Sequence, residues 1–446
     1  MLRLIMSRKR VDTMIKEEVH RKIADFREIG IPEYVRREAP VNLADRMVAT
    51  IIGARRAGKS FRSLQVADDL IAQGAVPDTR HVCPVDFDNP ILGALEASEL
   101  RQIQSVFLEA TPECDLKTPA VFVLDEIHKI QGWESYVIDL SRNPNWKVIV
   151  TGSSSKLLRD EIATELRGKS VSSTVYPLSF TEFLKFRGFE HSPASTKGQA
   201  EAARLFEDYL AWGAYPAVAL ADEPLREALL REYFDTMILR DVLQRYNVSK
   251  PMHCTRLYRH LLSSIAKPHT LQSAYAYLKQ TGHATSRDSV RDYLRWAEDA
   301  WLMCAVPIYS HSQKEQERNY KKVYCIDWAL AVRNSNVWDG SFARALENLV
   351  YLHLRRSFDR LYYYLTRSKR QEVDFIAVDN RGNPALAVQV CSDLSSPETV
   401  EREVAPLAAA VRFFGIPEAV VVTRNEERTL EYDGTRIAAI PAWKWL

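Results

Sequence analysis

Two motifs, about seventy residues apart, constrain this chain more than any other feature. Residues 53–60 read Gly-Ala-Arg-Arg-Ala-Gly-Lys-Ser, which fits the phosphate-binding pattern of Gly, four residues, Gly-Lys and Ser or Thr. Residues 121–124 are an apolar run that is followed by Asp125 and Glu126, as in a buried strand that ends in two carboxylates. Together the motifs predict a site for a nucleoside triphosphate, its magnesium ion and a hydrolytic water.

The residue types of the first motif suit this chemistry. Residues 47–52 predict a buried parallel strand, and Gly53 and Gly58 allow a tight turn whose N–H groups face phosphate oxygens. We expect Lys59 to reach the β- and γ-phosphates and the Ser60 hydroxyl to bind Mg²⁺. The alternative is an ordinary strand-to-helix turn. The predicted nucleotide contacts are Gly53, Ala54, Arg55, Arg56, Ala57, Gly58, Lys59, Ser60, Phe61 and Ser153.

The two acids of the second motif have different predicted roles. Asp125 would hold the magnesium shell, and Glu126 would act as the general base toward the attacking water. The alternative is a surface acid pair after a strand, and we assign His128 no role. A third strand is expected from residue 146. It ends near Thr151, Ser153 and Ser154, any of which could sense the γ-phosphate, unless they form a plain Ser-rich turn.

The order of the motifs resembles AAA-type ATPases of the archaeal-ATPase-like group that carry a C-terminal nuclease-like domain of unassigned function. The matching segments are residues 53–60, 124–126, 151–154, 176–183, 213–216, 239–242 and 372–375. The resemblance implies ATP hydrolysis, self-association into a ring or other homo-oligomer, and an arginine that each subunit supplies to its neighbour's ATP. Arg167 is the better candidate for this arginine and Arg159 the weaker, although the family typically has Gly-Arg where this chain has Arg167-Gly168.

Composition excludes some classes of protein. With 60 basic and 58 acidic residues the formal net charge is +2, so any DNA contact must come from a local patch. The six cysteines form no C-x-x-C pair, which argues against structural zinc and a disulfide framework and favours a reducing cytoplasm. No apolar run approaches the length of a membrane span, and the charged N-terminus does not resemble a signal peptide. We therefore expect a cytoplasmic protein without a membrane partner.

The chain is too long for one hydrophobic core. The predicted fold class is α/β, with a P-loop AAA-type parallel sheet, a helical lid, a winged helix-turn-helix and a C-terminal restriction-endonuclease-like domain. The expected boundaries are a helical arm at 1–45, the ATPase core at 46–185, the lid at 186–250, the winged helix at 251–330 and the nuclease-like domain at 331–446. Within the arm, residues 12–38 predict an amphipathic helix.

Residues 286–295 predict the recognition helix of the winged domain. Ser286 would cap it, and Arg287, Arg291 and Arg295 recur every fourth residue on one exposed stripe that could follow DNA phosphates. The alternative is a structural or oligomerisation module, because Asp288 and Asp292 partly cancel the arginine charge.

The C-terminal segment resembles a metal-dependent nuclease fold that has lost key groups. Glu347 and Asp374 match the helix and strand carboxylates that the resemblance implies, but Gln389 stands where Glu is expected and Cys391 where Lys is expected. An amide is a weaker magnesium ligand, and a thiol does not replace a cation. We therefore expect a domain that keeps the fold and does not cut DNA.

The leading interpretation is an oligomeric, ATP-hydrolysing motor or remodeller that acts on DNA, with branched DNA among the candidates. One alternative is a nucleotide-gated switch or antitoxin-like regulator that binds a protein partner. A second alternative is a nuclease gated by ATP.

Overall fold

The computed structural model describes residues 2–153, 166, 168–283, 285–338, 341–366 and 371–446, with side chains from Thr13 onward. It divides into two compact units, Met1–Val175 and Tyr176–Leu446. Each unit has its own hydrophobic core.

The first unit is built on a five-stranded sheet in the order β2-β3-β4-β1-β5, and every pair of neighbours is parallel. Its three central strands are almost wholly buried, as expected for apolar strands covered on both faces. The strands are β1 (Val48–Ile52), β2 (Val82–Asp86), β3 (Ala120–Asp125), β4 (Trp146–Gly152) and β5 (Ser170–Thr174).

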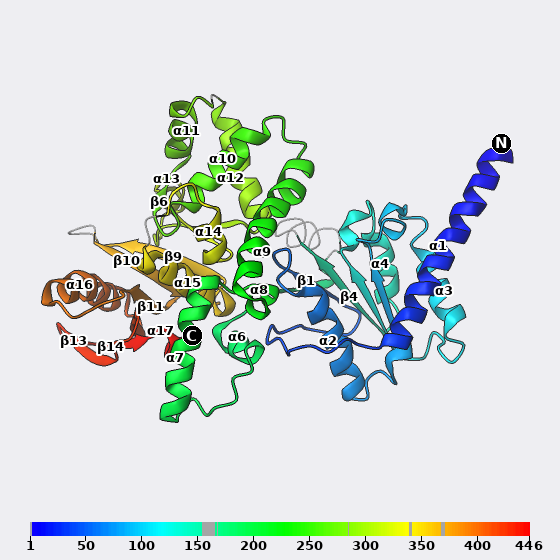
Figure 1. Cartoon of the computed structure of the whole chain (residues 1–446), viewed down its shortest axis with the longest axis horizontal. Helices are drawn as coiled ribbons and strands as arrows, with labels where there is room; N and C mark the ends of the chain where they lie inside the picture. Colours follow the sequence, from blue (N-terminus) through cyan, green and yellow to red (C-terminus); the bar gives the residue numbers. More distant parts are fainter. Residues whose placement is uncertain (1, 154–165, 167, 284, 339–340, 367–370) are drawn as a thin grey trace. The chain divides into compact units, whose positions relative to one another are not determined.

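Helices precede and connect these strands. They are α1 (Leu2–Ile29), α2 (Lys59–Ala72), α3 (Arg101–Ala110) and α4 (Glu134–Ser141), with short 3-10 turns at Thr79–His81, Leu92–Ala94 and Ile127–Lys129. The long helix α1, blue in Figure 1, packs on α3 and β2 through a face that buries Ile15, Val19 and Ile23. The predicted end at residue 38 is wrong. The helix ends at Ile29, because Gly30 takes a left-handed conformation (φ 76°) and Pro32 follows closely.

The second unit begins with helices. They are α6 (Phe180–Phe186), α7 (Thr196–Trp212), α8 (Pro216–Leu220), α9 (Glu223–Thr236) and the π-helical segment Met237–Gln244. Ser179 caps α6 with a complete capping box that involves Glu182, so the Pro-Leu-Ser-Phe-Thr-Glu-Phe stretch is a helix start whose polar residues satisfy free N–H groups.

Three helices and a small antiparallel sheet follow. They are α10 (Pro251–Leu262), β6 (Pro268–His269), α11 (Leu271–Gln280), α12 (Arg287–Asp299), β7 (Met303–Val306) and β8 (Lys321–Cys325), with sheet order β6-β8-β7. Strand β7 ends at Val306, because Pro307 has no N–H for a ladder. The short helix α13 (Gln313–Arg318) lies between β7 and β8.

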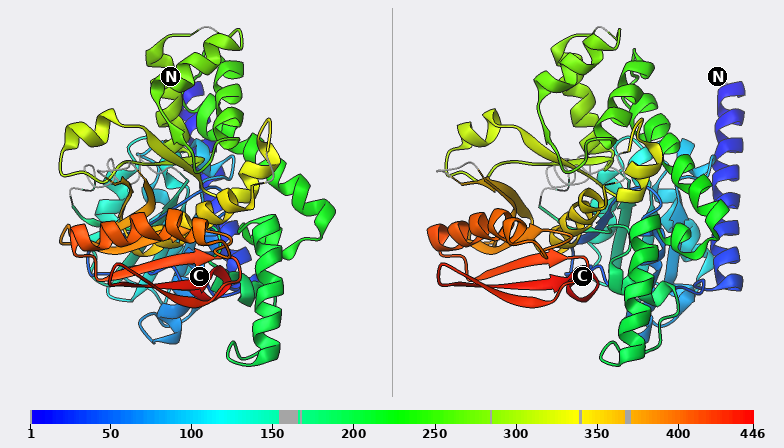
Figure 2. Two further views of the ribbon diagram at one scale, coloured as in Figure 1. Left: turned by 90° about the vertical axis from the view of Figure 1, so that its left-hand side faces the viewer. Right: turned by 60° about the vertical axis from the view of Figure 1, so that its left-hand side comes forward.

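The C-terminal part is a six-stranded mixed sheet in the order β13-β14-β12-β11-β10-β9. Helix α16 lies along this sheet (Figure 2) and packs on β10, β11, β12 and β14, closing a core that includes Val373, Val404 and Val421. The elements are α14 (Trp328–Asn334), α15 (Phe342–Ser357), β9 (Arg360–Leu365), β10 (Glu372–Val378), β11 (Pro384–Val390), α16 (Pro397–Phe414), β12 (Glu418–Thr423), β13 (Arg428–Tyr432), β14 (Thr435–Pro441) and α17 (Ala442–Trp445).

The predicted α/β class is confirmed by the parallel core sheet and the additional mixed sheet. Among the described helices, none has the length and apolar character needed to cross a membrane.

Candidate functional site

In the turn between β1 and α2, a close neighbour or the backbone conformation favours glycine at two positions. A Cβ on Gly53 would lie 2.1 Å from the carbonyl oxygen of Val175, so only glycine fits beside that strand end. Gly58 caps α2 in a left-handed conformation (φ 99°), which glycine adopts without strain. The N-terminus of a fourteen-residue helix therefore opens directly from the loop, as in sites that bind phosphate.

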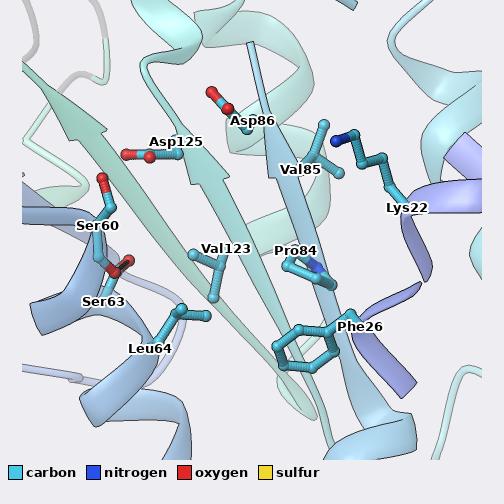
Figure 3. Close-up of a pocket in the computed structure, with 10 residues that line it drawn as sticks. All are labelled: Lys22, Phe26, Ser60, Ser63, Leu64, Pro84, Val85, Asp86, Val123 and Asp125. Atoms are coloured by element: carbon cyan, nitrogen blue, oxygen red, sulfur yellow. Dashed lines mark hydrogen bonds between the residues drawn. The ribbon is translucent and has the colours of Figure 1, made fainter. Parts of the chain in front are cut away.

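Lys59 is the buried cation of this turn, with 6% of its surface exposed. Its Nζ donates to the carbonyl of Ala54 (3.1 Å) and lies 3.6 Å from Oε1 of Glu126. The neighbouring Ser60 is exposed, and its hydroxyl points toward Asp125 in Figure 3. The structure thus brings together the two motifs that the sequence holds apart.

Thr151 at the end of β4 links the two acids of the second motif. Its hydroxyl donates to Oδ1 of Asp125 and accepts from the backbone N–H of Glu126 (3.0 Å). The bond to the Glu126 N–H is buried and the bond to Asp125 is part-buried, so one hydroxyl group contacts both acids. Of the sequence candidates for the third strand, Thr151 and Ser153 are described and buried. Ser154 lies outside the described residues.

The electrostatics of Glu126 favour its charged form. Burial would raise the pKa of this carboxyl, but Lys59, His128 and Arg55, with a hydrogen bond from Ser153, lower it below its ordinary value. Its backbone is left-handed (φ 55°), a strained conformation for a side chain of this kind. Within the described part of the chain, its buried Oε2 has no hydrogen-bond partner, although Nδ1 of His128 lies 3.4 Å away.

Asp125 behaves differently. Burial raises the pKa of this carboxyl, while hydrogen bonds from Ser60 and Thr151 act against that rise. A half-buried carboxylate beside a serine hydroxyl supplies the two oxygens that hold Mg²⁺ in P-loop sites. The glycine backbone, Lys59 and this pair therefore fit a triphosphate with Mg²⁺.

The sequence analysis did not predict a role for Arg37, which contacts the turn between β1 and α2. This arginine is 4% exposed. Its Nη1 donates to the carbonyl of Ala57 (2.6 Å), and its backbone N–H donates to Gln65 of α2 (3.1 Å). No motif marks Arg37, because it precedes the first strand in a segment without regular structure.

A second missed residue is Asp86, at the end of β2. Its Cα pairs with that of Asp125 in the parallel register, and both side chains line a cavity of about 240 Å³ together with Ser60 and with Lys22 from α1 (Figure 3). Burial raises the pKa of Asp86, and Lys129 and Lys22 oppose this rise. The sequence pattern that could have indicated Asp86 is an apolar strand that ends in an acid at residue 86.

The remaining predicted contacts are spread over the loop. Ala54 and Ala57 are fully buried, whereas Phe61 is 48% exposed. Arg55 is half-buried, and Arg56 is exposed with a left-handed backbone (φ 65°). Arg159 and Arg167 lie outside the described residues.

The predicted recognition helix is present as α12, and Ser286 caps it. Its arginine stripe is partly neutralised by its own acids. Arg291 pairs with Asp288 (2.7 Å), and Arg295 pairs with Asp292 (3.1 Å). Arg287 lies over the ring of Tyr275.

In the C-terminal sheet, Glu347 and Asp374 converge as predicted, but around a cation that the sequence comparison did not place there. Lys322 of β8 contacts both carboxylates. The thiol of Cys391 instead lies 3.1 Å from the carbonyl of Asp393. A lysine therefore lies beside both carboxylates, but it comes from β8 and not from the position of Cys391, where the resemblance implies one.

Family models match three segments of the chain. Residues 45–184 match a family model described as an AAA domain. Residues 203–338 and 342–445 match two family models described as domains of unknown function.

Two curated relatives match along most of their length. An uncharacterized protein of Methanocaldococcus jannaschii is 28% identical over 98% of this chain and 97% of its own. An uncharacterized protein of Haemophilus influenzae is 26% identical over 89% of this chain and 94% of its own.

Similar solved structures include a Walker-type ATPase of Pyrococcus abyssi, at 15% identity and a TM-score of 0.44, covering 71% of this chain and 95% of that one. Cdc6p of Pyrobaculum aerophilum gives 11% identity and a TM-score of 0.27, over 68% of this chain and 88% of that one.

Proposed function

Residues 45–184 form an AAA-type P-loop ATPase domain, and from this premise we propose that the protein binds ATP with Mg²⁺ and hydrolyses it. The observation that carries the proposal is the convergence of Lys59, Asp125, Glu126 and Thr151 at one end of the parallel sheet. ATP supplies the scissile γ-phosphate, and Mg²⁺ neutralises developing charge on its oxygens.

The roles of the protein groups follow from their surroundings. The backbone of residues 53–58 and the Lys59 ammonium would hold the phosphates, while Ser60 and Asp125 would hold the metal. Lys59 and His128 lower the pKa of Glu126 and so keep it ionised. The carboxylate would orient the attacking water and take up its proton as hydrolysis proceeds. Thr151 would position both acids through the hydrogen bonds of its hydroxyl group.

Two variants test the assignment. Lys59→Ala should lose ATP binding, measured with a fluorescent ATP analogue. Glu126→Gln should bind ATP and lower kcat by roughly a hundredfold or more. Wild-type turnover by Glu126→Gln would show that the base lies elsewhere.

We further propose that the protein self-associates and that a neighbouring subunit supplies Arg167 to the γ-phosphate, as the resemblance implies. Neither Arg167→Ala nor Glu126→Gln should hydrolyse ATP alone. Mixed subunits should regain part of the rate, because one interface then combines an intact base with an intact arginine. A monomer in every nucleotide state, measured by light scattering, would contradict this proposal.

DNA is the proposed target of the ATP-driven motion, with the arginine stripe of α12 as its contact. Arg291 and Arg295 are exposed, and exposed ion pairs contribute little free energy, so phosphates could displace their aspartate partners. Reversing the charge of Arg287, Arg291 and Arg295 should weaken DNA binding and flatten its salt dependence, since fewer counterions are released.

A second candidate function is a nucleotide-gated switch that binds a protein partner. The ion pairs within α12 favour it, because they leave the stripe close to neutral. The two functions differ in one measurement. DNA should stimulate the ATPase rate of a remodeller, and the stimulation should vanish in the charge-reversed variant. An ATPase rate that neither linear nor branched DNA changes would favour the switch.

A further inference from the structure

A buried ammonium group in the second unit lies where three carboxylates converge. Lys322 on β8 is 1% exposed. Its Nζ donates to Glu347 of α15, to Glu372 of β10 at 2.8 Å and to Asp374 of β10 at 3.1 Å. An ammonium has three N–H donors, so these bonds use all of its capacity. We call these four residues the Lys322 cluster.

Other groups hold the carboxylates in place. The Tyr324 hydroxyl donates to the same oxygen of Glu347 that receives Lys322 (2.7 Å). The backbone N–H of Val390 donates to Oδ2 of Asp374 (2.9 Å). Since Tyr324 is two residues from Lys322 on one strand, both side chains face the same side of that strand. The site is therefore organised by β8 as much as by the C-terminal sheet.

The charges in the cluster are unequal. Burial alone would lower the pKa of Lys322, but Glu347, Asp374 and Glu372 raise it well above its ordinary value. Burial and the neighbouring Asp374 raise the pKa of Glu347, and burial also raises that of Glu372. Lys322 therefore keeps its positive charge, and the pKa values of Glu347 and Glu372 lie above their ordinary values.

Nζ of Lys322 occupies the point where oxygens of the three carboxylates meet. Magnesium in proteins takes carboxylate oxygens together with several waters at about 2.0–2.1 Å, which requires an accessible centre. Here the centre is filled by an ammonium whose stem is buried. Removing one partner of a buried ion pair leaves an uncompensated charge and is strongly destabilising, so the lysine is expected to stay in place.

We propose that Lys322 is the resident cation of this pocket, standing where the nuclease-like resemblance implied a divalent metal ion, and that the cluster fastens β8 to α15 and β10. Other contacts join the same elements. Asn348 of α15 exchanges two hydrogen bonds with the backbone of Cys325 (2.7 and 2.9 Å), and Tyr324 stacks on Tyr351 of α15 with ring centroids 4.5 Å apart. The Lys322 cluster therefore joins the small sheet to the C-terminal sheet and does not activate water.

The wild-type chain offers a direct test through lysine labelling. Lys321 is the adjacent residue and is exposed, so it is a matched control on the same strand. Limited acetylation followed by mass spectrometry should modify Lys322 at least on the order of a hundredfold more slowly than Lys321, since a buried amine reacts only after local opening. Millimolar Mn²⁺ should leave that ratio unchanged. Faster labelling of Lys322 with Mn²⁺ would mean that a metal displaces the lysine and would overturn the proposal.

A second test asks whether removing the ammonium creates a metal site. All samples carry Asp125→Asn, which removes the carboxylate proposed for the nucleotide-linked metal. The parent should bind no Mn²⁺ by electron paramagnetic resonance at concentrations where Lys322→Met binds one ion per chain. Adding Glu347→Gln should abolish that binding.

Two results would contradict the proposal in this second test. One is a parent chain that binds Mn²⁺ and loses it with Glu347→Gln. The other is a folded Lys322→Met chain that binds none. If Lys322→Met does not fold, the labelling ratio in the wild type still decides the question.

Discussion

The backbone N–H of Glu126 donates a hydrogen bond to the hydroxyl of Thr151, with 3.0 Å between the two atoms. The same hydroxyl donates to Asp125. One side chain on β4 therefore contacts both Asp125, the proposed magnesium ligand at the end of β3, and Glu126, the proposed general base that follows it.

The first prediction concerns this hydroxyl. Thr151→Val keeps the shape of the side chain but removes both bonds, so kcat for ATP should fall roughly ten- to a hundredfold with little change in KM. Thr50→Val is the matched control, because Thr50 is equally buried and its hydroxyl has no hydrogen-bond partner among the described residues. Equal rates for the two variants, measured by phosphate release, would remove Thr151 from the mechanism.

The second prediction concerns Asp86, which pairs with Asp125 across neighbouring strands. Its negative charge should attract a cation bound near Asp125. Asp86→Asn should therefore raise the Mg²⁺ concentration needed for half-maximal ATPase rate several-fold, because it removes a negative charge near the proposed metal ligand Asp125. Asp88→Asn is the control, since Asp88 pairs with Lys129. An unchanged Mg²⁺ titration for Asp86→Asn would assign Asp86 a purely structural role.

A third prediction concerns Gly213, which is packed against the carboxylate of Asp327. A Cβ on Gly213 would lie 2.4 Å from Oδ1 of Asp327, and the neighbouring Ala214 N–H donates to Oδ2 (2.7 Å). Gly213→Ala should lower the free energy of unfolding by about 2–4 kcal/mol, because it combines a left-handed backbone with a clash.

Gly415→Ala separates those two effects. Gly415 is also left-handed (φ 64°), but no atom lies within 4 Å of its added Cβ, so this change should cost about 1 kcal/mol. Equal losses in urea unfolding would show that the contact with Asp327 adds nothing.

The fourth prediction concerns acid stability. Burial, helped by the charge of Arg356, lowers the pKa of His353 from 6.5 to about 4, and its ring packs against Trp445 (4.6 Å between centroids). Because the folded state favours the neutral ring, the stabilising contribution is present above pH 6.5 and is lost as the pH falls toward 4. His353→Phe keeps an aromatic ring and removes the titration. Its melting temperature should decline less than that of the wild type between pH 6.5 and 4.5, and parallel declines would contradict the assignment.

The parts of the site that the sequence predicted are local. Gly53, Gly58, Lys59 and Ser60 belong to one turn whose spacing determines its geometry. Asp125 and Glu126 end an apolar run, and the strand β3 ends where that run ends. The cap of α12 at Ser286 follows from the same kind of local signal.

Residues outside any motif escaped prediction, because their roles depend on contacts across the fold. Arg37 reaches the loop carbonyl of Ala57 over a separation of 20 residues. Lys322 meets Asp374 over a separation of 52. No sequence pattern marks contacts over such separations. Periodicity indicates the type of a single element and does not indicate which elements become neighbours.

The sequence by itself determined the phosphate-binding turn, the acidic strand end and the succession of strands and helices, because hydrogen bonding and side-chain periodicity act within a few residues. Only the tertiary structure decided that Thr151 joins the two acids, that Asp86 lies beside them and that a lysine from β8 fills the C-terminal carboxylate pocket. The physical reason is that a buried charge must find its partners within hydrogen-bonding distance, and sheet order and helix packing decide which distant residues those partners are.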